Sequence, residues 1–291
     1  MAEIYLRDLQ RRRMRRSTQD TAYRTLKILC RIFGEDRLVG SINDRDVSDC
    51  VQAREAEGVR AISIAKELRY LRSALSAAGV PRPCKLGAPR VVLRKAKRLR
   101  RAELKRLLEV APARLRLLLV TAAATGMRNS ELRHLTWGGV DLEAGTSEVT
   151  AKEHLGFRPK SGQERGPFPL PAPALEALRA LHAVTKFPGP EHPVFLRTEK
   201  RRRSVPWEQA ALCRAVKEVF EAAGVARVSG LHALRKTWAS ELLDRGFGVH
   251  DVQELGGWAT PDVLLPHYAS SSADRRRAAA AAIGELLAGR G

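Results

Sequence analysis

The sequence has no long apolar run. No stretch of about 18 consecutive apolar residues occurs, the length that a membrane-spanning helix needs. No basic helical segment carries a strongly aromatic face, which disfavours binding along a membrane surface. What remains is a protein that folds around a core of its own, and 291 residues suffice for one or two such domains.

Cysteine is also scarce. The four cysteines, Cys30, Cys50, Cys84 and Cys213, lie far apart and form no Cys-x-x-Cys pair, and no histidine has a spacing that suits zinc. We therefore expect no bound metal and reduced, packed thiols. Residues 1–6 lack the apolar run of a secretory signal, so the expected location is cytoplasmic.

Acidic residues are too few to balance the basic ones. The chain has 52 Lys plus Arg against 32 Asp plus Glu, which gives a net charge of +20, and its pI is near 10.7. Such an excess concerns a protein's partners more than its fold, and the obvious partner is a polyanion. Because a membrane surface is disfavoured, we expect double-stranded DNA or another nucleic acid.

The first 80 residues have the pattern of a small helical domain. Apolar residues recur at helical spacing in segments 21–38, 44–57 and 62–78, and residues 41–44 form a cap for the second segment. Tyr23 and Tyr70 fall within these patterns, so we expect both in the core. Residues 1–20, with Tyr5, are polar and rich in arginine, which is typical of a solvated helix face or of an arm that contacts phosphate.

Residues 81–98 read as an extended basic linker, because prolines and a glycine break the periodicity and basic residues follow. Such a linker either follows a DNA backbone or is merely solvated. Beyond it, helical patterns occur at 101–110, 114–124, 173–184, 207–223, 231–243, 249–255 and 274–287, with an alternating, turn-rich stretch at 141–170. The expected fold is mainly α with a small antiparallel β-sheet, in two domains, 1–80 and 99–291, that could close around DNA as a clamp.

The clearest chemical signals lie between residues 231 and 268. In a helix, His232 and Arg235 share one face, which places a proton-transfer group beside a planar phosphate-binding fork. A Gly-Gly-Trp sequence ending at Trp258 follows. Tyr268 comes next and is the only tyrosine in the second half of the chain.

Two further signals lie upstream. Arg128 stands at a turn into a helix, and Glu131 follows it three residues later. Lys160 lies in a Pro-Lys-Ser-Gly turn within the expected sheet. Each signal is weak alone, but together they suit one reaction.

That reaction is the cleavage of a phosphodiester without a metal ion. Tyr268 supplies a phenol with an ordinary pKa of ~10, which nearby guanidinium groups would lower. Arg128 and Arg235 can bind phosphate in a bidentate manner and stabilise the transition state. His232 can accept a proton, and Lys160 can protonate the departing 5′ oxygen. No metal, nucleotide or organic cofactor is required.

The ordered set of Arg128, Lys160, His-x-x-Arg, Gly-Gly-Trp and Tyr268 resembles the catalytic domain of tyrosine recombinases, the phage integrase family, over residues 99–270. The resemblance implies a site-specific recombinase or integrase that forms a 3′-phosphotyrosyl link through Tyr268. It also implies a supporting role for Glu131 and an indole N–H of Trp258 that donates to phosphate. Two structural alternatives stay open: Glu131 could pair with a neighbouring helix charge, and Trp258 could belong to the core.

The resemblance further implies four protomers on two DNA sites, a Holliday junction, a C-terminal helix that docks on a neighbouring protomer, and accessory DNA-bending proteins of a bacterial or phage nucleoid. Two rivals remain: a type IB topoisomerase, which religates the same strand, and a catalytically silent DNA-binding relative. The spacing from Trp258 to Tyr268 is one residue longer than is usual in the family, and Pro266 precedes the tyrosine.

Overall fold

The computed structural model of the chain describes residues 1–80, 89, 98–160, 162, 164–186, 188–197, 206–225, 228, 230–261, 264, 277 and 281. The chain divides into two compact units, Met1–Leu93 and Arg94–Gly291. Each unit has its own hydrophobic core. Most of the expected linker, nearly all of the expected helix at 274–287, and Tyr268 lie outside the described residues.

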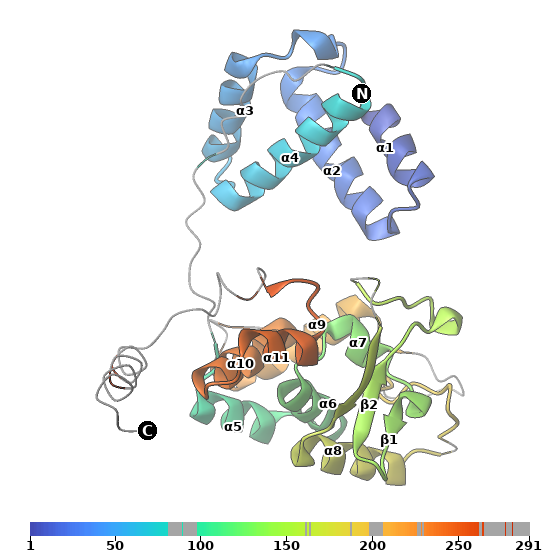
Figure 1. Ribbon diagram of the computed structural model, residues 1–291. Helices are drawn as coiled ribbons and strands as arrows, with labels where there is room; N and C mark the ends of the chain where they lie inside the picture. Colours follow the sequence, from blue (N-terminus) through green and yellow to red (C-terminus); the bar gives the residue numbers. More distant parts are fainter. Residues whose placement is uncertain are drawn as a thin grey trace. The chain divides into compact units, whose positions relative to one another are not determined.

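The first unit is a bundle of helices (Figure 1). They are α1 (Ala2–Arg11), α2 (Arg16–Phe33), α3 (Asp44–Ala56) and α4 (Ala61–Ala77), with the 3₁₀ turn η1 (Val39–Ser41) before α3. Helix α2 contacts each of the other three. The expected cap of α3 is confirmed: Asn43 Oδ1 accepts from Asp46 N at 3.2 Å, and Asp46 Oδ2 accepts from Asn43 N at 2.8 Å.

One expectation for this unit is wrong. The buried stripe of α2 runs from Ala22 to Leu29 at helical spacing, and Tyr23 falls beside that stripe, so its side chain is 55% exposed instead of part of the core. The arginines of the first residues are exposed, as a solvated helix face requires, while α1 buries Tyr5 and Leu9 against α2 and α4. Their spacing of four places both on one helix face.

The second unit is mainly helical. Its described helices are α5 (Arg101–Val110), α6 (Ala113–Thr125), α7 (Asn129–Arg133), α8 (Ala172–Ala183), α9 (Gln209–Ala222), α10 (Leu231–Asp244) and α11 (Val249–Gly256), with the 3₁₀ turns η2 (Trp137–Gly139) and η3 (Glu153–Leu155). Helix α6 contacts both α8 and α10, and its sequence is apolar on several faces, as a central helix requires. Helix α10 in turn contacts α11.

A small antiparallel sheet lies beside these helices (Figure 1). Its strands are β1 (Val140–Asp141), β2 (Thr146–Val149) and β3 (Arg165–Pro169), in the order β1-β2-β3. Val149 pairs with Arg165, so β3 begins where β2 ends, and residues 150–164 connect them. The expected fold class, mainly α with a small antiparallel sheet, is confirmed. No helix in the described ranges is long and apolar enough to cross a membrane.

Candidate active site

The C-terminal end of α11 is the point where the candidate side chains meet. The last carbonyl groups of a helix have no partner within the helix, and they carry partial negative charge. Three consecutive carbonyls here each accept a hydrogen bond from a different arginine. The pairs are Leu255 with Arg165, Gly256 with Arg235, and Gly257 with Arg128. Side chains from β3, α10 and the start of α7 therefore converge on one helix end.

Arg235 is the most deeply placed of the three arginines. Its side chain lies on α10 and the residue is only 2% exposed. One terminal nitrogen donates to the carbonyl of Gly126, which ends α6, and the other donates to the carbonyl of Gly256 at 2.7 Å. Arg235 thus joins the ends of α6 and α11, and its guanidinium is held in a single orientation.

Arg128 and Glu131 form a pair at the start of α7. Glu131 accepts from the Arg128 backbone N–H at 2.8 Å and from Arg128 Nη1 at 2.6 Å. Arg128 Nη2 donates to the carbonyl of Gly257 at 2.6 Å. Glu131 is 4% exposed, whereas the Arg128 side chain is 21% exposed. Arg128 is therefore anchored from behind and still reaches solvent, as a phosphate-binding group must.

Trp258 covers Arg235. The guanidinium carbon of Arg235 lies 3.6 Å from the centroid of the Trp258 ring, a cation–π contact, and the ring stacks on Trp238 at 6.2 Å. The two glycines before it permit this return of the chain: a Cβ at Gly256 would overlap the Trp258 ring, and Gly257 has a left-handed φ of 63°. The Gly-Gly-Trp sequence thus allows the Trp258 ring to lie over the Arg235 guanidinium.

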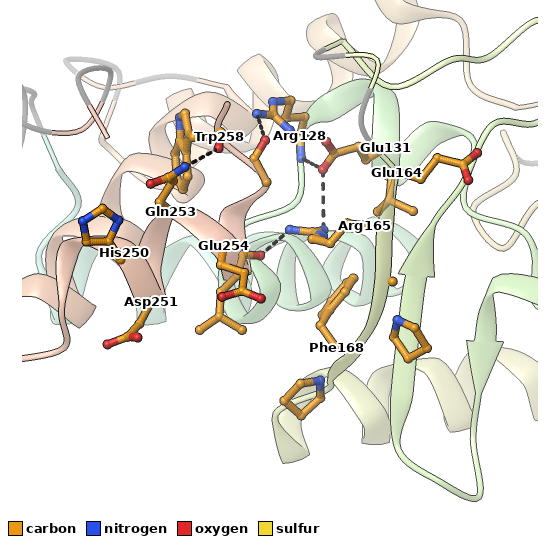
Figure 2. A pocket seen from close by; sticks show the side chains of 16 residues that line it. Arg128, Glu131, Glu164, Arg165, Phe168, His250, Asp251, Gln253, Glu254 and Trp258 are labelled. Carbon is orange, nitrogen blue, oxygen red and sulfur yellow. Dashed lines mark hydrogen bonds and ion pairs between the residues drawn. The ribbon is translucent and has the colours of Figure 1, made fainter. Parts of the chain in front are cut away.

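Arg165 is a functional candidate that the sequence did not reveal. It is the first residue of β3, and its guanidinium lies between Glu131, whose Oε2 is 3.7 Å from Arg165 Nη2, and the ring of Phe168, whose centroid is 4.0 Å away. Figure 2 shows Arg165 and Arg128 on two sides of Glu131. Burial lowers the pKa of Arg165 from its usual range, and the nearby Glu131 carboxylate opposes this shift. The one sequence signal for it was an arginine directly after the lysine-bearing turn.

The remaining predicted residues are His232, Lys160 and Tyr268. His232 is exposed in the first turn of α10, one turn before Arg235. Lys160 is exposed in a turn closed by a hydrogen bond from the Gly162 N–H to the Pro159 carbonyl at 3.0 Å. Tyr268 lies outside the described residues.

The charges of the cluster suit a phosphodiester. Arg128 and Arg165 both pair with the Glu131 carboxylate, whereas Arg235 donates to the carbonyls of Gly126 and Gly256, so three guanidinium groups lie around this end of α11. Preorganised guanidinium groups in a partly buried site stabilise charge that develops on phosphate oxygens. Within the described ranges, no group of three His, Cys, Asp or Glu side chains is placed to hold a metal ion.

Curated relatives share part of the chain. Tyrosine recombinase XerC of Xylella fastidiosa strain 9a5c is 35% identical over 144 residues, which are 50% of this chain and 44% of the relative. Tyrosine recombinase XerA of Pyrococcus furiosus is 29% identical over 180 residues, 60% of this chain and 58% of the relative. The chain thus spans about half the length of the curated relatives it matches.

Solved structures share the fold. The Tn1549 transposon integrase in complex with a circular intermediate DNA superposes with a TM-score of 0.76 at 18% identity, covering 95% of this chain and 97% of that one. A lambda integrase dimer bound to a core site gives 0.66 at 19% identity, covering 94% and 97%. The family model described as the phage integrase family matches residues 97–275, more than half of the sequence. The chain therefore belongs to the phage integrase family.

Proposed function

We propose that the protein is a site-specific DNA recombinase that cuts and rejoins DNA strands through a 3′-phosphotyrosyl intermediate. The observation that carries the proposal is the convergence of Arg128 and Arg235 on the end of α11, with Glu131 behind Arg128 and Trp258 over Arg235. Relatives named as tyrosine recombinases and an integrase of Salmonella phage P22 support the same reaction.

In the proposed reaction, the Tyr268 oxygen attacks the scissile phosphorus and the bond from phosphorus to the 5′ oxygen breaks. Arg128 and Arg235 hold the non-bridging oxygens and stabilise their charge in the transition state. His232 accepts the phenolic proton, and Lys160 gives a proton to the departing 5′ oxygen. Attack of a 5′-hydroxyl from the partner strand then reverses the step and releases Tyr268, so the bond energy is conserved and no cofactor is consumed.

The two units suggest how DNA would be held. We assign residues 1–80 to a core-binding domain, 81–98 to a basic linker and 99–291 to the catalytic domain, with double-stranded DNA between the domains. The net charge of +20 supports a polyanionic partner. A homotetramer on two DNA sites, joined through the C-terminal segment and assisted by DNA-bending proteins, is the assembly that strand exchange would need.

A covalent-capture assay tests the proposal. Protein is incubated with nicked duplexes of random sequence in EDTA, without nucleotide, and adducts are separated under denaturing conditions. We expect an adduct with the wild type and with Tyr23→Phe, a matched loss of an exposed phenol, and none with Tyr268→Phe. Tight DNA binding with no adduct from any form would instead support the catalytically silent relative. An adduct that religates only its own strand would support a topoisomerase.

A further inference from the structure

The Arg165 side chain contacts three separate groups at the candidate active site. Its Nη1 donates to the Leu255 carbonyl at the end of α11, its Nη2 forms an ion pair with Glu131, and its guanidinium stacks on Phe168. Leu255 lies 90 residues further along the chain. One side chain thus ties the edge strand β3 to α11 and to the carboxylate behind Arg128 (Figure 2).

This environment is costly for a charged group. The Arg165 side chain is only 10% exposed. Among the described residues its Nε and Nη2 make no hydrogen bond, and Nη2 meets Glu131 as an ion pair at 3.7 Å. Burying an ion pair costs desolvation energy that its attraction offsets only when the geometry is good, so such a pair is weak support for stability alone. A buried, incompletely satisfied arginine beside a reactive cluster is better explained by what it positions.

Arg165 lies on the more enclosed side of Glu131. Its guanidinium is enclosed by Glu131, Phe168 and the end of α11, while Arg128 occupies the more exposed side of Glu131 at 21% exposure. Arg165 therefore reaches solvent less than Arg128 does. Glu131 is the side chain that both arginines contact, and both arginines also donate to carbonyls at the end of α11.

We propose that Arg165 is a positioning residue for strand cleavage: it fixes the Glu131 carboxylate between two guanidinium groups and so holds Arg128 against the end of α11. This inference rests on the proposed function. When Arg165 is absent, Glu131 has one cation instead of two, and the carboxylate and the Arg128 fork can rotate together away from α11. A small displacement of a catalytic group is enough to slow a reaction greatly.

The test measures single-turnover adduct formation on a nicked duplex carrying the captured sequence, with DNA affinity measured in parallel. We expect Arg165→Met to slow cleavage about 100-fold while leaving the Kd within about twofold. Arg158→Met is the matched control: this arginine is 76% exposed, pairs with Glu153 and lies in the connection that leads into β3. Its cleavage rate should equal that of the wild type.

A second comparison separates positioning from general stability. In a Glu131→Gln background, Arg165→Met should slow cleavage by less than about threefold, since the residue through which it acts is already changed. If Arg165→Met fails to fold, Arg165→Lys serves instead. It keeps the charge but offers no planar fork, and we expect an intermediate loss of about tenfold.

Either of two results would overturn the inference. The first is cleavage at the wild-type rate by Arg165→Met, or by Arg165→Lys where that variant takes its place. The second is a loss of cleavage rate in the Glu131→Gln background that is as large as in the wild-type background. Both are distinct from failure of the proposed function, in which the wild type itself forms no adduct.

Discussion

Replacement of Trp258 tests whether the ring face or the indole N–H is the important part of this residue. The ring lies 3.6 Å from the guanidinium carbon of Arg235, and Arg235 is 2% exposed. A cation–π contact in such a desolvated site contributes about 2 kcal/mol. Trp258→Phe keeps an aromatic face but has no N–H, whereas Trp258→Ala removes both.

The structure sets the expected magnitudes. Trp258 is half-buried, and Trp258→Ala loses the contact with Arg235 and the stack on Trp238, so we expect a loss of about 2–3 kcal/mol in unfolding free energy. If the ~2 kcal/mol of the cation–π contact is lost from the transition state, cleavage falls about 30-fold. Trp258→Phe should keep most of the contact and slow cleavage by less than about tenfold.

The assay is single-turnover adduct formation at saturating protein, with thermal unfolding of each variant measured separately. The expected order of rates is wild type, then Phe, then Ala. A Phe variant as slow as the Ala variant, although more stable, would refute the stacking argument. It would assign the contribution to the indole N–H, which the sequence had suggested as a donor to phosphate.

Two other predictions concern single positions. Gly256→Ala should displace the indole ring and slow cleavage by about tenfold or more, whereas Gly166→Ala, whose added Cβ meets nothing within 4 Å, should leave it unchanged; equal rates would contradict the close packing. Burial raises the pKa of the Cys50 thiol to about 11. At pH 8 its thiolate fraction is therefore about 100-fold below that of an ordinary cysteine, and iodoacetamide should label exposed Cys213 before Cys50; comparable labelling of Cys50, read by mass spectrometry, would contradict its burial.

Local patterns predicted the parts of the fold that depend on short-range physics. The helix now assigned to α11 was expected at 249–255 and spans Val249–Gly256, because apolar spacing and the following glycines act over a few residues. The cap at Asn43 is equally local. The prediction for Tyr23 was wrong because this residue follows buried Ala22 in α2. Adjacent helix positions point in different directions, so Tyr23 faces solvent although it lies within an apolar pattern.

The candidate site likewise contains residues that the sequence predicted and residues that it did not. Arg128 and Arg235 were selected from the sequence by motif, and the structure brings both to the end of α11. Arg165 was not selected, because its partners lie on α7 and α11, and no short-range pattern marks a strand residue whose contacts are distant in sequence. The cover of Arg235 by Trp258 likewise depends on tertiary packing.

The most direct test of the account is to identify the residue that carries the DNA. The wild-type adduct is trapped on a nicked duplex, digested with nuclease and protease, and the modified peptide is sequenced by mass spectrometry. The account predicts a nucleotide attached through its 3′ phosphate to Tyr268. Attachment to any other residue, or a 5′-phosphate linkage, would contradict it.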